Sequence, residues 1–294
     1  MINTLPRPPI IPHPKPKRPP KGNRMTIAMG MLCDGGVILA ADTRITNSYT
    51  GATYDAVKVQ QGRSDNARYV AAYSSEIASS GESLCQAVIS RLESKNPKSL
   101  AEVSPIVENT MTEWSKAYTL KDDRPSTEVI LGAFFGSSEV GLFLCQPPKT
   151  VVRKRFQDTN GYVGSGLGTS ITDPLFRILF SELVSPRVCL CRIGYLMHRA
   201  KTDYGAYCGG ETDAVFLRNG VNEPIWIERL DMKQAEAIGE FFDSALSLIG
   251  FTVISEEDDP NKVASAVADI IAHVAVIYRG LKFRSRNTGD LVEL

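Results

Sequence analysis

Residues 25–58 constrain the fold of this chain more than any other segment, because they carry a strand–turn–strand pattern. An apolar run from Thr26 to Leu32 is followed by Cys33-Asp34-Gly35-Gly36, and a second apolar run continues to Asp42. Asp-Gly and Gly-Gly pairs supply the positive φ angles that tight turns need. The segment therefore predicts a β-hairpin, and Ala56–Val59 predicts a third short strand.

Three polar residues, Thr26, Asp42 and Lys58, recur at equal intervals in this segment. A threonine hydroxyl becomes a good nucleophile only when a base removes its proton, and a free α-amine on the same residue can serve as that base. A nearby Lys58 ammonium would keep the amine neutral, and Asp42 would anchor the ammonium. Each residue alone is more simply a strand threonine, a strand-end cap or a solvated charge, but the three together favour catalysis.

The segment resembles the start of proteasome β-type subunits and bacterial proteasome-like enzymes, the threonine members of the N-terminal nucleophile (Ntn) hydrolase superfamily. The resembling residues are Met25-Thr26-Ile27, the run Asp34–Arg44, and Lys58. The resemblance implies that the mature enzyme begins at Thr26. It also implies an α+β fold, a four-layer αββα sandwich, and homo-oligomeric rings with active sites facing a chamber.

The resemblance extends to a Gly-Ser-Gly whose serine supports the threonine amine, and Ser165 is the matching residue. Farther along, Cys208-Gly209-Gly210 aligns with a serine and two glycines of the family, so Cys208 replaces the serine. Gly205 falls where the family has aspartate, and Asp203 could substitute through a local shift. We expect Cys208 to be a buried small side chain rather than a nucleophile.

An oxyanion hole is expected after the strand Tyr69–Tyr73, at Ser74 or Ser75. The family has a glycine-containing turn here, whose backbone N–H binds the oxyanion. The glycine is missing from this chain, but either serine retains an N–H.

The first 24 residues differ in composition from the rest, with eight of the 17 prolines, six Lys/Arg and no Asp or Glu. Proline fixes φ and removes a backbone donor, so we expect an extended, disordered tail that lacks the apolar region of a signal peptide. Thr26 gains a free amine only if residues 1–25 are absent. The tail is a propeptide cleaved before Thr26, or Met25 is the true initiator, or the tail is retained and the subunit is inert.

The remaining composition excludes several classes of function. The 33 basic and 33 acidic residues cancel, so no global field favours nucleic acid or a membrane surface. Six dispersed cysteines and three distant histidines suggest neither a metal site nor a disulfide framework, which is typical of a reducing cytosol. No apolar run reaches membrane-spanning length. We expect no cofactor and a cytoplasmic protein.

The rest of the chain predicts a single domain over residues 25–294, with a helical extension from about residue 231. Helices are expected over 77–92, after a capping box at Ser99-x-x-Glu102, from Asp173 to Leu183, over 188–202, from Asp231, and over 263–278. Strands are expected over 128–135, 140–145, 151–156, 212–217 and 224–230.

We therefore predict a threonine-type endopeptidase that cuts peptides or unfolded protein with Thr26 as its nucleophile. Two alternatives stay open: an inactive scaffold subunit of the same fold, and an amidase that acts on a small amide. Cleavage preference, ring size and any ATPase partner cannot be read from the sequence.

Overall fold

The computed structural model describes residues 26–46, 52–118, 125–136, 139–154, 161–179, 183–219, 221–254, 265, 268–269, 272, 276 and 279–292. The strands are β1 (Ile27–Cys33), β2 (Gly36–Asp42), β3 (Arg44–Thr46), β4 (Thr53–Asp55), β5 (Val59–Arg63), β6 (Ala67–Ser75), β7 (Thr127–Phe135), β8 (Glu139–Gln146), β9 (Thr150–Lys154), β10 (Tyr162–Gly166), β11 (Thr212–Arg218) and β12 (Ile225–Trp226). The helices are α1 (Ala78–Lys95), α2 (Leu100–Ser115), α4 (Thr169–Leu179), α5 (Pro186–Asp203) and α6 (Arg229–Ile254).

The first large sheet has the strand order β10-β1-β2-β11-β12 and contains the predicted hairpin. β1 and β2 pair antiparallel with Cys33 opposite Gly36, and Gly35 has a φ of 73° in the turn between them. The turn chemistry and the alternation of apolar residues act over a few neighbouring residues, so this hairpin was predictable. The hairpin is confirmed.

The second large sheet has the order β5-β6-β7-β8-β9, again with antiparallel neighbours. Leu39 of the first sheet and Val70, Ile130 and Leu142 of the second belong to one apolar cluster. Gly30 of β1 lies at this contact, because a Cβ there would come within 2.6 Å of the Leu142 side chain. The two sheets therefore pack closely, which brings residues of β6 and β7 next to residues of β1 and β10.

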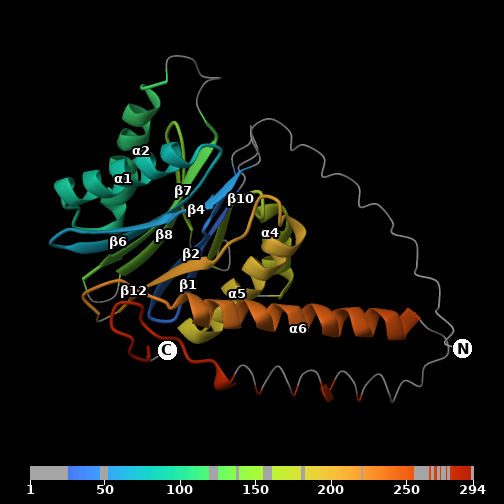
Figure 1. Cartoon of the computed structure of the whole chain (residues 1–294). Helices are drawn as coiled ribbons and strands as arrows, with labels where there is room; N and C mark the ends of the chain where they lie inside the picture. The colour runs from blue at the N-terminus through green and yellow to red at the C-terminus, as the bar shows by residue number, and fades with distance from the viewer. Residues whose placement is uncertain are drawn as a thin grey trace, which may run out of the picture.

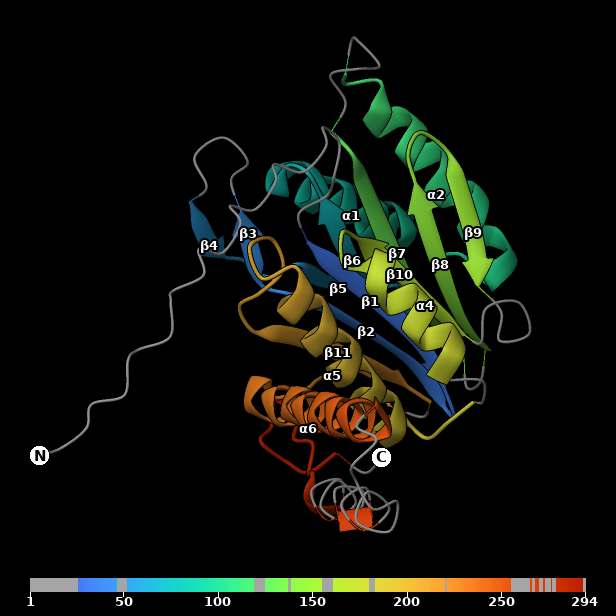
Figure 2. The ribbon, with the colours of Figure 1, turned by 90° about the vertical axis from the view of Figure 1, so that its right-hand side faces the viewer.

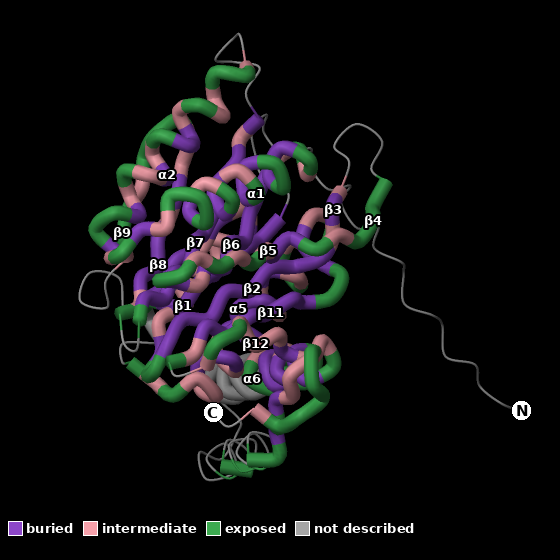
Figure 3. The backbone as a smooth tube through the Cα atoms, turned by 90° about the vertical axis from the view of Figure 1, so that its left-hand side faces the viewer, coloured by how far each residue is buried: buried purple, intermediate pink, exposed green. Residues whose placement is uncertain are grey.

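Helices cover the outer face of each sheet (Figures 1 and 2). α1 and α2 pack on the second sheet, whereas α4, α5 and α6 lie on the side of the first. Met232, Ala235 and Ile238 of α6 are buried in the same apolar cluster as β1 and α5. In Figure 3 the strands at the centre are largely buried and the exposed residues lie on helices and connections. The α+β class is confirmed, and α6 is part of the packed core.

Several predicted boundaries differ from the observed ones. α4 begins at Thr169, because the Gly168 carbonyl already accepts the N–H groups of Ile171 and Thr172. Only Ile225–Trp226 of the last predicted strand pairs with β11. The capping box is wrong in its contacts, because Ser99 makes no side-chain cap and Glu102 accepts from the Lys98 N–H at 3.1 Å.

Other predictions fall on residues outside the described ranges. These are the tail before Thr26 and most of the helix over 263–278. Within the described ranges, every helix is too short or too polar to cross a membrane.

Candidate functional site

A fully buried ion pair lies at the end of β2. Lys58 Nζ donates to Asp42 Oδ1 at 2.7 Å and also to the Arg44 carbonyl, and the Lys58 and Asp42 side chains are both 0% exposed. Asp42 also accepts the Ile27 N–H at 3.1 Å and the Gly209 N–H at 3.0 Å. Buried charges persist only when they are paired and hydrogen-bonded, so this carboxylate ties β1, β2, the start of β5 and the segment after α5 together. Lys58 is not a solvated charge.

Thr26 lies immediately before the residue that is bonded to Asp42. It is 4% exposed, and its Oγ1 is buried without a hydrogen-bond partner in the described part of the chain. Its carbonyl accepts the Leu167 N–H at 3.0 Å. A buried hydroxyl left unpaired costs about 1–3 kcal/mol, so such a group calls for an explanation.

The Gly-Ser-Gly segment lies directly against Thr26. Gly166 pairs with Ile27 and has a φ of 103°, and a Cβ on it would lie 1.9 Å from the Thr26 carbonyl oxygen. Only glycine permits this approach. The preceding Ser165 pairs with Ala28 on β1 and is 1% exposed.

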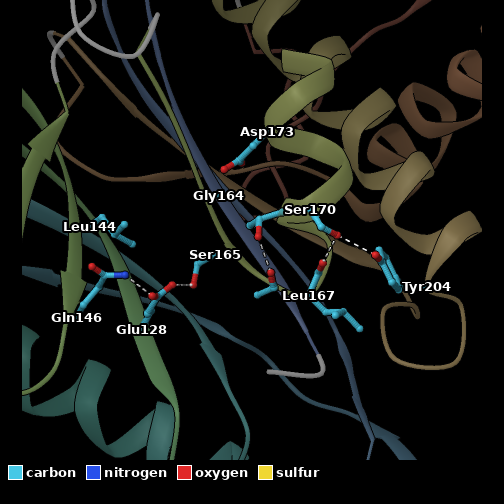
Figure 4. A pocket seen from close by; sticks show the side chains of 11 residues that line it. Glu128, Leu144, Gln146, Gly164, Ser165, Leu167, Ser170, Asp173 and Tyr204 are labelled. Atoms are coloured by element: carbon cyan, nitrogen blue, oxygen red, sulfur yellow. Dashed lines mark hydrogen bonds between the residues drawn. The ribbon is translucent and has the colours of Figure 1, made fainter. Parts of the chain in front are cut away.

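Ser165 belongs to a hydrogen-bonded chain that connects the two sheets. Its Oγ donates to Glu128 Oε2 at 2.6 Å, and it also shares a short hydrogen bond with Ser74 Oγ. The other Glu128 oxygen accepts from Gln146 Nε2. Figure 4 shows Glu128 on β7 pointing toward Ser165. The sequence-based prediction missed Glu128; a carboxylate inside the apolar run of β7 was the signal that could have found it.

The strand pairing separates the two predicted oxyanion donors. The Tyr73 N–H donates to the Lys58 carbonyl at 3.2 Å. The Glu76 N–H donates to the Ser126 carbonyl, on the other side of the strand, at 2.9 Å. Because successive N–H groups of a strand point to alternate sides, the Ser75 N–H points to the side of Lys58. The Ser74 N–H points toward β7 instead. Of the two serines, Ser75 is therefore the one whose N–H lies on the same side of β6 as Lys58.

Cys208 and Asp203 have different surroundings from those two serines. Cys208 is fully buried, and burial, followed by the nearby negative charge of Asp42, raises the pKa of its thiol above the ordinary value. It is a neutral thiol that packs in the core, as expected. Asp203 pairs with Arg199 on its own helix at 2.9 Å. In the described contacts Asp203 bonds to neither Thr26 nor Ser165. The carboxylate that bonds to Ser165 is Glu128 of β7.

A pocket of about 610 Å³ opens beside Ser165 and Gly166. Its lining residues are Glu128, Leu144, Gln146, Gly164, Ser165, Gly166, Leu167, Thr169, Ser170, Asp173 and Tyr204. Ser170 and Tyr204 share a hydrogen bond of 2.7 Å at one side of it (Figure 4). Burial raises the pKa of the Asp173 carboxyl. The volume lies within the range of small-ligand pockets.

The described residues contain no group of three or more histidine, cysteine or acidic side chains placed to hold a metal ion.

Comparison with known proteins identifies the fold. No protein-family model and no curated protein sequence matches the chain. A Gly-1 mutant of Anbu from Hyphomicrobium sp. strain MC1 aligns at 16% identity and a TM-score of 0.62, covering 80% of this chain and 100% of that one. Anbu (ancestral beta-subunit) from Yersinia bercovieri aligns at 14% identity and 0.62, covering 76% and 97%. An Anbu complex from Pseudomonas aeruginosa, described as a helical assembly, aligns at 13% identity and 0.61, covering 80% and 99%.

These structures correct the family predicted from the sequence. The identification as a proteasome β-type subunit or bacterial proteasome-like N-terminal threonine hydrolase is wrong, because the matching structures are Anbu proteins, a distinct, proteasome-related family. The Thr26–Lys58 block is therefore less specific for that family than the sequence suggested. At these identities the likeness establishes the fold alone.

Proposed function

We propose that this protein hydrolyses amide bonds, as a threonine-type peptidase acting on peptides or unfolded protein, with Thr26 as its nucleophile once residues 1–25 are removed. The buried and unpartnered Thr26 Oγ1, beside an Asp42–Lys58 pair that is fully buried, carries this proposal. A hydroxyl without a partner next to a buried cation is a costly arrangement for a structural threonine. It is the arrangement that a nucleophile needs.

Each group has a defined role in the proposed reaction. The Thr26 amine, freed by removal of residues 1–25, takes the hydroxyl proton, and the positive charge of Lys58 disfavours a second charge on that amine and stabilises the forming alkoxide. Oγ1 attacks the amide carbon, and the Ser75 N–H donates to the oxyanion. The C–N bond then breaks as the amine returns the proton to the leaving nitrogen. Water adds to the resulting ester, releases the acid and restores the hydroxyl.

Self-assembly and location follow from separate observations. The Pseudomonas aeruginosa Anbu complex is described as a helical assembly, which supports homo-oligomerisation of this chain. All six cysteines are free thiols, which supports a reducing compartment such as the cytosol. The helices on the outer face of each sheet support the αββα order of layers.

A non-catalytic scaffold subunit is the second candidate. Thr26 is only 4% exposed and is preceded by 25 residues in the full chain, so its nitrogen is part of a peptide bond there. If the chain keeps that segment, Thr26 lacks its base. An amidase for a small amide has the same chemistry as the peptidase and differs from it only in substrate.

The test is the intact mass and N-terminal sequence of the protein from its native cell, followed by turnover of a fluorogenic peptide library. A chain that begins at Thr26 and loses its turnover in Thr26→Ala supports the peptidase. Thr112→Ala on α2 is the matched control, because this threonine lies on the far helix layer. A chain that retains residues before Thr26, or full turnover in Thr26→Ala, refutes the proposal. Turnover of small amides without peptides identifies the amidase.

A further inference from the structure

We propose that Glu128 is a positioning residue that, through Ser165, holds the Thr26 amine in its base-competent orientation. This inference rests on the proposed function. From the sequence, Asp203 is the expected substitute for the family's aspartate, because Gly205 stands at the aspartate position. The buried carboxylate at Ser165 comes instead from the second sheet.

Glu128 is a charged group built into the interior. It is 5% exposed, its two oxygens bond to Ser165 and Gln146, and Ser165 and Ser74 are 1% and 0% exposed. Burying a carboxylate is costly unless several donors satisfy it. β7 otherwise consists largely of apolar and small residues, and a carboxylate adds nothing to their packing. The hydrogen bonds of Glu128 therefore account for its position in this strand.

The direction of these hydrogen bonds decides what Ser165 can do. An ionised carboxylate only accepts, so Ser165 commits its single hydroxyl proton to Glu128 Oε2. The Ser165 oxygen is then an acceptor for its other neighbours. Ser74 is therefore the donor in the Ser74–Ser165 hydrogen bond.

The strand register places this fixed acceptor on β10, two residues before the Leu167 that bonds to Thr26. Ser165 is opposite Ala28, Gly166 is opposite Ile27, and the Leu167 N–H binds the Thr26 carbonyl at 3.0 Å. When Thr26 is the first residue, one N–H of its amine donates to the Ser165 oxygen and the nitrogen lone pair stays available to the Thr26 hydroxyl. The reverse polarity, with Ser165 donating to the amine, would occupy that lone pair.

The same hydrogen-bonded chain of side chains extends to the residue before the proposed oxyanion donor. Ser74 precedes Ser75, whose N–H is the proposed oxyanion donor, and Ser74 is held by Ser165. Glu128 thus sets the polarity of a hydrogen-bonded chain that runs from the base to the strand of the oxyanion donor. Networks of this kind act as a unit, so deletions of their members are not additive.

The test is a double-mutant cycle with Glu128→Gln, Ser165→Ala and the double variant, measured on the processed enzyme. We expect Glu128→Gln to lower kcat by roughly tenfold or more and to leave KM within about twofold, because the base rather than the pocket is affected. Because Glu128→Gln removes the negative charge that Ser165 bonds to, and that charge favours the protonated amine, the acid limb of the kcat profile should move to lower pH, by about one unit. In the Ser165→Ala background, Glu128→Gln should have almost no further effect.

Glu139→Gln is the matched control, because Glu139 is an exposed glutamate at the start of β8. Wild-type kcat and an unshifted pH profile in Glu128→Gln would overturn the inference and leave the Thr26 mechanism intact. Additive losses in the double variant would also overturn it. If Glu128→Gln does not fold, Ser165→Ala alone decides, since wild-type activity in that variant rules out an action through Ser165. An inactive wild-type enzyme whose chain begins at Thr26 refutes the proposed function itself.

Discussion

Replacement of Lys58 by methionine tests the physical basis of the site most directly. Methionine keeps the length and apolar stem of lysine but removes the charge that Asp42 pairs with at 2.7 Å. Because both side chains are 0% exposed, Asp42 is left buried with only the Ile27 and Gly209 N–H groups as donors. Breaking a buried pair in this way costs about 3–5 kcal/mol. That loss is a large part of a typical stability of about 5–15 kcal/mol.

The assay is urea unfolding of Lys58→Met, Asp42→Asn and the double variant. The double variant should lose less stability than the two single variants together, because it removes both charges and leaves neither unpaired. For a domain of this size the single variant should melt about 6–20 °C lower than wild type.

Arg91→Met is the control, because it breaks the partly exposed Arg91–Glu113 pair on the outer helices. Such pairs contribute about 0–1 kcal/mol. If Lys58→Met costs no more than Arg91→Met, or if the two losses at Asp42 and Lys58 simply add, the ion pair does not organise the site and the reasoning is refuted.

Three further predictions concern neighbouring groups. Gly166→Ala should abolish turnover and lower the melting temperature more than Gly136→Ala, because the Gly166 methyl would meet the Thr26 carbonyl, while Gly136, also at a positive φ, has open space around it. Mass spectrometry after iodoacetamide treatment at pH 8 should find Cys208 unmodified in the folded protein and modified in urea; modification of the native thiol would contradict its burial and raised pKa. Because burial raises the pKa of Asp173, its ionised form opposes folding: this carboxyl favours folding below its unfolded pKa, and that contribution is lost as the pH rises through the folded value. Asp173→Asn should therefore stabilise the protein more at pH 7 than at pH 3, as measured by thermal unfolding, and an equal effect at both values would refute the assignment.

Some of the boundary predictions fail because a neighbouring backbone group makes the hydrogen bond in a different place. Ser99 and Glu102 have the spacing of a capping box, yet Glu102 bonds to Lys98 instead. The predicted start of α4 at Asp173 is too late. Pro174 is typical of a first helical turn, but the Gly168 carbonyl accepts hydrogen bonds that form an earlier turn. The family prediction is wrong because the matching structures are Anbu proteins, so the Thr26–Lys58 block is less specific for one family than its pattern indicated.

The sequence by itself determined the hairpin, the α+β class and the equal spacing of Thr26, Asp42 and Lys58 along the chain. These depend on turn chemistry and on alternation along one strand, which neighbouring residues set. Only the tertiary structure decided that Glu128, rather than Asp203, is the carboxylate at Ser165, and that the Ser75 N–H lies on the same side of β6 as Lys58. The first follows from the close packing of two sheets whose strands are far apart in the chain, and the second follows from the pairing of β6 with the segment at Lys58. No pattern within either strand encodes which residue of the other sheet it will meet.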